Sequence, residues 1–191
     1  MPTVTAPLTR PQMVALVRHE CGHAVIGKAC GFTPEDLYVR RTQPGTGVDL
    51  RPALASTGDF CDYASRRIRT LFAGALAQTL DKGVTEDGAA RNLLAQDGTA
   101  ENDAGKIREL ARVVIGFRNF GATPEQFDGE LNALLEEYFN EAAEMVVANA
   151  QLIEDLAAFC IGKINVTLAR NQARNRPFVL GAEINSFIEA A

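Results

Sequence analysis

The sequence predicts a mainly α-helical protein with one small β element. Three observations support this prediction. Apolar residues recur at helical spacing over most of the chain. Tryptophan is absent and aromatic residues make up only 7% of the chain, so the core must rest on Ala, Leu, Val and Ile, which suit packed helices. Residues with strand character gather in one segment, 35–52. We therefore expect a helical bundle with one small β-hairpin or short edge strand.

The first helix follows a short N-terminal arm. We expect residues 1–8 to form a flexible arm and residues 9–191 to form a single helical domain, because 191 residues suffice for one core. Thr9 is a suitable N-cap. The helix then runs to about Ala29 and stops at Gly31, because glycine readily adopts the backbone conformation that follows a helix.

The β element is predicted from a change of pattern after this helix. The sequence "LYVR" at 37–40 is typical of a short strand. The sequence "QPGTG" at 43–47 indicates a turn, and "VDL" at 48–50 is a possible return strand.

The rest of the chain returns to helical spacing. A long helical pattern covers 123–175, which exceeds the usual length of a globular helix, so we expect a break near Asn149 or Gly162. The other segments with helical spacing are 58–83, ending at Gly83, then 86–96, 97–117 and 181–190.

Composition excludes some classes of partner. The net charge of -5 argues against a nucleic-acid binder, which normally carries a basic face. No apolar run approaches the roughly 20 residues of a membrane span, so we expect no membrane partner. We expect reduced thiols and a cytoplasmic protein, because no CxxC pairing is formed by the four cysteines, at 21, 30, 61 and 160.

The motif "HECGH" contains both histidines of the chain, His19 and His23. On a helix they lie about 40° apart on one face, so that both imidazoles can bind one metal ion at roughly 2.0–2.1 Å. Glu20 lies at the rim of that face, about 100° from His19. It is placed to take a proton from a metal-bound water, which is the chemical content of the HExxH pattern.

The neighbours of the histidines have different expected roles. Cys21 points away from them, and we expect it to be a small core residue. Gly22 would let another backbone approach closely. The alternative is a plain helical bundle in which the two histidines are ordinary polar residues. That reading leaves two imidazoles and a carboxylate facing the interior without a partner, at a high cost of desolvation, whereas a metal ion removes this difficulty.

A catalytic zinc normally has three protein ligands and a water. Since no histidine remains, the third ligand must be Asp, Glu or Cys, and the residues alone leave this choice open.

Several stretches of the sequence carry a resemblance to one protein family. In chain order, these are "HECGHAV", "LFAGALAQTL", "TAENDAGKIRELAR", "VVANAQLIEDLA" and "VLGAEI". Over about residues 12–188 the chain resembles the protease domain of the FtsH family, the ATP-dependent zinc metalloproteases. The first motif is highly specific, and the others gain weight from their order. The resemblance implies an FtsH protease-domain-like fold and a Zn²⁺ ion.

The resemblance also implies the third zinc ligand, Asp103. Taken alone, Asp103 fits equally well as the N-cap of a helix. Asp97 and Glu101 are the nearby alternatives. Gln78 stands where the family has a Glu that we take to support the histidines. An amide can still accept a hydrogen bond from an imidazole, but it carries less charge, so zinc affinity should be lower.

The implied activity is zinc-dependent hydrolysis of peptide bonds in unfolded or flexible polypeptides, with Glu20 as the general base. The strand residues Leu37, Tyr38 and Val39 are candidates for pairing with an extended substrate, although an ordinary edge strand is the equal alternative. The sequence contains no GxxxxGK[ST] phosphate loop. We therefore expect a protease-like domain without its own ATPase, which would need a separate unfoldase or act as a homo-oligomer.

A second hypothesis is a zinc-binding regulatory or interaction protein of the same fold without turnover. Two basic clusters remain, "RRIR" at 66–69 and "RNQARNR" at 170–176. We interpret both as solvated helix faces, with docking of a partner as the less favoured alternative.

Overall fold

The computed structural model describes residues 9–40, 43–45, 54–169 and 179–191. It confirms the prediction of a mainly α-helical fold. Its elements, in chain order, are α1 (Arg10–Ala29), β1 (Tyr38–Arg40), β2 (Gln43–Gly45), α2 (Thr57–Gln78), α3 (Asp87–Leu94), α4 (Glu101–Arg118), α5 (Pro124–Ala148), α6 (Ala150–Ala169) and α7 (Gly181–Ala190).

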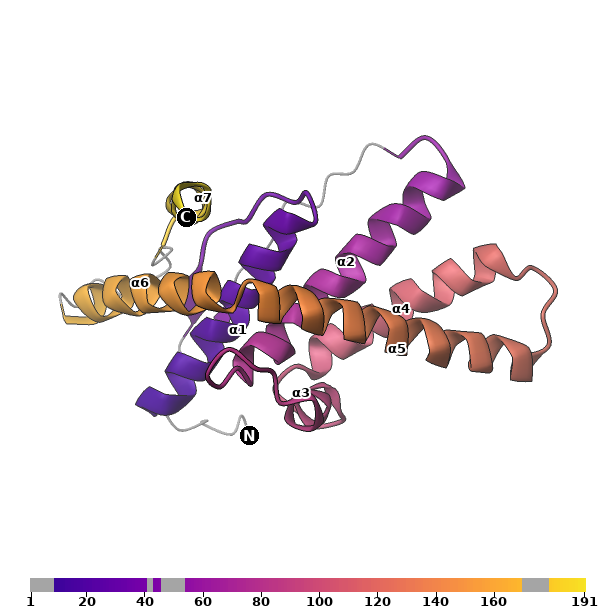
Figure 1. Cartoon of the computed structure of the whole chain (residues 1–191), viewed down its shortest axis with the longest axis horizontal. Coiled ribbons are helices and arrows are strands. Elements are labelled where there is room, and N and C mark those ends of the chain that lie inside the picture. Colours follow the sequence, from indigo (N-terminus) through magenta and orange to yellow (C-terminus); the bar gives the residue numbers. More distant parts are fainter. Residues whose placement is uncertain (1–8, 41–42, 46–53, 170–178) are drawn as a thin grey trace, which may run out of the picture.

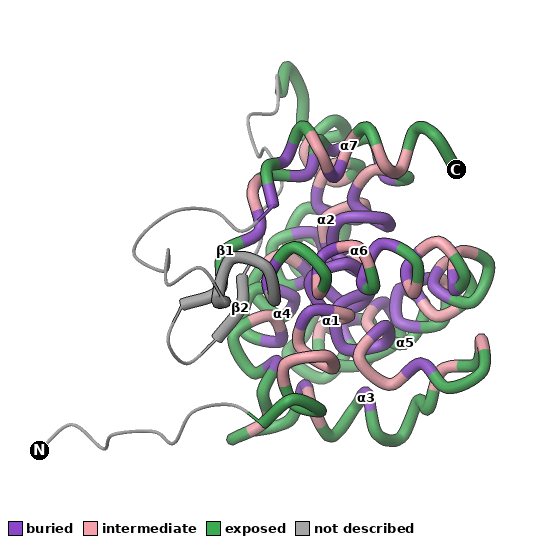
Figure 2. The backbone as a smooth tube through the Cα atoms, turned by 90° about the vertical axis from the view of Figure 1, so that its left-hand side faces the viewer, coloured by how far each residue is buried: buried purple, intermediate pink, exposed green. Residues whose placement is uncertain are grey.

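The helices pack around a central pair, α1 and α2. Helix α2 contacts α4 and α5 on its other sides, while α1 contacts α6. Figure 1 shows α5 and α6 following one another across this pair, with α4 beside α5. Buried residues concentrate where these five helices meet, whereas α3 is mostly exposed (Figure 2). Both histidines lie on α1, which belongs to this central pair.

The start of the first helix follows the sequence prediction. The Thr9 N–H donates to Gln12 Oε1 at 2.9 Å at the start of α1. The helix ends at Ala29, and Gly31 follows with a φ of +83°, a conformation that glycine adopts without steric strain.

The structure tests two predicted helix boundaries, the end of α2 and the break in the long C-terminal pattern. Helix α2 ends at Gln78, so the predicted end at Gly83 is wrong. The reason is a turn beyond it, in which the Asp81 N–H donates to the Val84 carbonyl at 2.9 Å. The long C-terminal pattern breaks at Asn149, as predicted, while Gly162 lies inside α6.

The β element is partly as predicted. Tyr38–Arg40 forms a strand, but Gln43–Gly45, predicted as part of a turn, is its antiparallel partner, with Val39 opposite Pro44. The connecting residues 41–42 and the predicted return strand 48–50 lie outside the described residues, so the β-hairpin stays a prediction. Residues 1–8 and the basic cluster 170–176 also lie outside the described part of the chain.

Membrane-spanning potential and cysteine pairing were also predicted from the sequence. Across the described ranges, no single helix has the length and apolar character to cross a bilayer; α5 and 150–164 of α6 pass that test only as a pair, bent by 71° at their junction. The four cysteines carry free thiols. Cys21 is buried with 2% of its surface exposed, as expected for a core residue.

Candidate metal centre

Two glycines let α1 and α2 approach closely at the histidines. A Cβ added at Gly22 would lie 2.5 Å from the Ala73 carbonyl oxygen, so the prediction of a close backbone approach at Gly22 is confirmed. A Cβ added at Gly74 would lie 2.6 Å from His19 Nε2 and would also clash with the His23 ring. The two imidazoles therefore occupy the space that a side chain at position 74 would fill.

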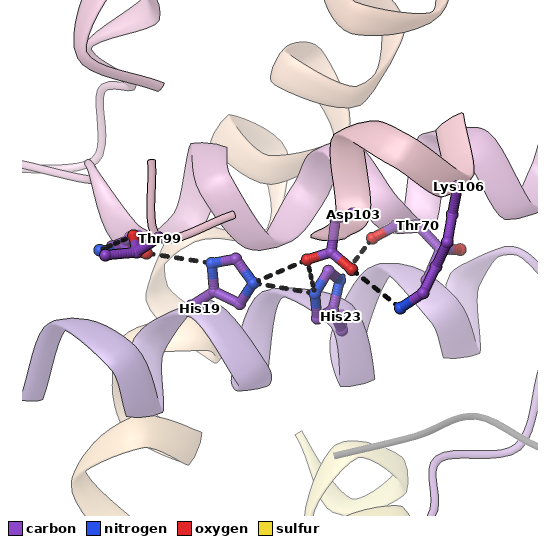
Figure 3. Close-up of polar contacts among 7 residues, drawn as sticks. His19, His23, Thr70, Thr99, Asp103 and Lys106 are labelled. Carbon is purple, nitrogen blue, oxygen red and sulfur yellow. Dashed lines mark hydrogen bonds and ion pairs between the residues drawn. The ribbon is translucent and has the colours of Figure 1, made fainter. Parts of the chain in front are cut away.

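The structure brings His19, His23 and Asp103 together, as Figure 3 shows. The two Nε2 atoms lie 3.0 Å apart. Asp103 Oδ2 lies 3.2 Å from His19 Nε2 and 3.3 Å from His23 Nε2. The imidazole rings are nearly perpendicular, at 89°. Three potential ligand atoms thus form a nearly equilateral triangle between α1 and the start of α4.

The hydrogen bonds on the far side of each ring decide where its lone pair points. His23 Nδ1 lies 2.7 Å from the Thr70 carbonyl oxygen. Since a carbonyl oxygen only accepts, His23 Nδ1 carries the proton. His19 Nδ1 lies 3.0 Å from Gln78 Oε1 and donates to it in the same way. In the neutral state both Nε2 atoms are therefore unprotonated and face each other and a carboxylate oxygen.

This arrangement fits a metal ion. Two imidazole lone pairs and a carboxylate repel one another unless a cation lies between them. Three ligands of a tetrahedral zinc, each at roughly 2.0–2.1 Å, lie roughly 3.3 Å from one another. The observed separations of 3.0–3.3 Å are close to that value. The buried His-His-Asp group could thus hold a metal ion.

The pKa shifts reflect the same convergence. Burial on its own lowers the pKa of His23, but the hydrogen bond and the charge of Asp103 outweigh burial, so the pKa is raised. Burial on its own raises the pKa of Asp103, but the hydrogen bonds that His19 and His23 donate to it when they are protonated outweigh burial and hold that pKa far below its usual range. The site therefore favours positive charge on the imidazole side of the cluster, whether from a proton or from a metal ion.

The second carboxylate oxygen of Asp103, Oδ1, has a partner of its own. Lys106 Nζ donates to Asp103 Oδ1 at 3.3 Å, while Oδ2 faces the histidines. This division directs one oxygen to the cluster and occupies the other, which favours ligation through a single oxygen. The side-chain amide of Gln78 has a second partner, because its Nε2 donates to Thr99 Oγ1 at 3.5 Å.

The remaining sequence candidates are placed as follows. Glu20 is buried, with 8% of its surface exposed, and its negative charge contributes to the raised pKa of His23. Asp103 is the third residue of α4, whose N-cap is Ala100, so the N-cap reading is wrong. The alternative ligands Asp97 and Glu101 are exposed and lie outside the ligand group.

The predicted substrate strand is placed but not tested. The Leu37 side chain is buried, and its N–H donates to the Val179 carbonyl at 2.9 Å. Tyr38 and Val39 pair with β2 along one edge of β1. Leu37 therefore already has a backbone partner within the chain, and the role of these three residues in substrate binding stays a prediction.

Sequence reasoning missed three contributors to the site. Thr70 acts through its carbonyl, which no side-chain pattern reveals, and Gly74 acts through the absence of a side chain. Lys106 was detectable, because it lies three residues after Asp103 and therefore on the same helix face.

Comparison with known proteins adds no family assignment. The chain matches no protein-family model, and no curated protein matches it. The resemblance to the FtsH family therefore stays an expectation, and the geometry of the His-His-Asp group carries the functional argument.

Proposed function

We propose that this protein is a zinc-dependent metallopeptidase that hydrolyses peptide bonds in unfolded or flexible polypeptides. The observation that carries the proposal is the convergence of three potential ligand atoms within 3.0–3.3 Å, directly beside a buried glutamate. The resemblance of the sequence to the FtsH protease domain supports the same activity. His19, His23 and Asp103 would hold the ion, and Glu20 would be the catalytic base.

Each residue has a defined part in this mechanism. When bound, a zinc ion would supply a water of lowered pKa and would polarise the scissile carbonyl. Glu20 takes the proton of the attacking water and passes it to the leaving amine. Thr70 and Gln78 hold the imidazoles so that both Nε2 atoms would face a bound ion, and Lys106 occupies the second oxygen of Asp103.

A second candidate function is zinc binding without turnover, in a regulatory or interaction protein. One observation favours it: the group behind His19 is the neutral amide of Gln78 and not a carboxylate, so the protein gives this imidazole less electrostatic support as a metal ligand. A buried glutamate has no use in a purely structural zinc site, and this is why we favour catalysis.

The first test is the zinc content of purified protein. We expect about one zinc per wild-type chain after reconstitution and a loss of bound zinc in Asp103→Ala. Asn102→Ala is the matched control, because Asn102 is exposed on the same helical turn and lies outside the ligand group. A wild-type chain that binds no zinc would overturn the proposal.

The second test separates the two functions. Zinc-loaded wild type should cleave a labelled flexible protein such as casein, while Glu20→Gln should keep its zinc and lose at least ~100-fold in rate. Zinc binding without cleavage in the wild type would favour the regulatory alternative. The expected unfoldase partner or homo-oligomer would then be sought by adding candidate ATPases and by measuring the mass in solution.

A further inference from the structure

The arginines of the cluster "RRIR" on α2 differ in their contacts. Arg66 donates to the Cys30 carbonyl at 3.0 Å, and Arg69 forms an ion pair with Glu141 on α5. These two side chains are half-buried and have partners within the chain, so the interpretation as a solvated face is wrong for both of them. Arg67 is also half-buried, but within the described part of the chain it forms no hydrogen bond and no ion pair.

Arg67 lies on the face of α2 that borders the metal site. Thr70, Gly74 and Gln78 follow it at steps of three, four and four residues, and such spacing keeps residues on one helix face. All three of those residues touch or adjoin the two imidazoles. Arg67 therefore extends this face by one turn beyond Thr70, at the end of the site where Figure 3 places Thr70 and Lys106.

The electrostatics agree with this placement. Burial lowers the pKa of Arg67, while Tyr63 and Asp103 act against that shift. The guanidinium is thus close enough to feel the charge of the third metal ligand. That carboxylate does not satisfy it, because Asp103 Oδ2 faces the histidines and Oδ1 accepts from Lys106.

The donors of Arg67 are open to a ligand. The guanidinium stays charged at any relevant pH, and among the described residues none of its nitrogen atoms is a fully buried atom without a partner, so solvent reaches them. The planar fork of the guanidinium matches a carboxylate and binds it through two parallel hydrogen bonds. A site that holds such a group beside a metal ion is suited to a ligand that carries a carboxylate near the atom bound to the metal.

We propose that Arg67 forms a carboxylate-binding subsite beside the metal centre and selects peptide substrates with a carboxylate next to the scissile bond. This inference rests on the proposed peptidase function and names its substrate class. The carboxylate can come from an acidic side chain or from the C-terminus of the peptide, since both present the same group to the guanidinium.

The test measures binding to protein loaded with cobalt(II), whose visible absorption changes when a ligand enters the metal's coordination sphere. Three probes share a metal-binding hydroxamate: hydroxamate-capped alanine amide, which is uncharged, hydroxamate-capped alanine with a free C-terminus, and hydroxamate-capped aspartate amide. We expect wild type to bind at least one charged probe ~10-fold or more tighter than the uncharged probe. The charged probe that is preferred identifies the source of the carboxylate.

Substitutions assign the preference to one residue. Arg67→Met should bind all three probes with similar affinity, and Arg67→Lys should recover only part of the preference, because an ammonium lacks the bidentate fork. Arg108→Met is the matched control, because Arg108 is exposed on α4 and outside the ligand group, and it should keep the wild-type preference.

The failures of the two proposals are distinguishable. Equal binding of all three probes by wild type, or an undiminished preference in Arg67→Met, would overturn the role of Arg67 and leave the metal centre intact. A wild-type protein that takes up no cobalt(II), or whose spectrum responds to none of the probes, would overturn the peptidase proposal and the subsite with it.

Discussion

Two buried polar clusters lie along α2, and they differ in whether the protein completes them. In the first, Ser65 Oγ donates to the Cys61 carbonyl at 2.8 Å and lies 2.6 Å from the Tyr138 hydroxyl. Because the Ser65 proton goes to Cys61, Tyr138 must donate to Ser65. The polar atoms of this cluster are thus matched donor to acceptor within the chain.

The second cluster, at the histidines, is not completed in this way. Its outer hydrogen bonds are satisfied, with Thr70 and Gln78 accepting from the two Nδ1 atoms. Its centre contains three atoms that all act as acceptors when the histidines are neutral. The comparison teaches that burial alone does not mark a functional site: a closed cluster like Ser65–Tyr138 holds helices together, while a cluster of facing acceptors requires a cation.

The largest effect on this contrast is expected from Gly74→Ala. A methyl group there would lie 2.6 Å from His19 Nε2 and would displace both imidazoles, so we expect zinc affinity to fall by more than ~100-fold. The same substitution at an open helical position usually stabilises by about 0.5–1 kcal/mol. Isothermal titration with zinc measures the affinity, and thermal unfolding measures the change in stability.

Gly116→Ala provides the control for that experiment. Gly116 is an exposed residue inside α4, and a Cβ added to it meets no atom within 4 Å. It should bind zinc as the wild type does and unfold at a slightly higher temperature. Normal zinc binding in Gly74→Ala would show that the imidazoles do not occupy the position described above.

A smaller change is expected at Gln78, which contacts His19 Nδ1 and lies outside the His-His-Asp group. Gln78→Ala removes the acceptor of the His19 Nδ1 proton and should weaken zinc binding by about 10–100-fold. Gln78→Glu restores a carboxylate and should strengthen binding above the wild-type level, because a charged acceptor makes the imidazole a better ligand. Competition with a coloured chelator measures both affinities, and a weaker Gln78→Glu would contradict the assigned role.

The sequence predicted the parts of this site that lie within one helix. The spacing of His19 and His23, their shared face and the place of Glu20 beside them all follow from helical geometry. The helix boundaries at Ala29 and Asn149 were predicted too, because a glycine or an over-long pattern marks them.

The parts that depend on packing between helices could not be derived from the residues alone. Nothing in local spacing singles out Asp103 among the carboxylates of the chain. Its position beside the two histidines comes from the way α4 packs on α2. The contacts of Arg66 and Arg69 were missed for the same reason, since three arginines within four residues look alike in sequence and differ only in what the neighbouring segments place opposite them.

The smallest effect is expected in the closed cluster, from Tyr138→Phe. The substitution removes one hydrogen bond to Ser65 and should lower the free energy of unfolding by about 1 kcal/mol. Zinc affinity should not change, because the ring, its contact with Arg69 and the helix packing remain. Urea unfolding of Tyr138→Phe, Ser65→Ala and the double variant isolates the energy of the pair. A loss of zinc in Tyr138→Phe would show that the two clusters of α2 are coupled and would break the distinction drawn between them.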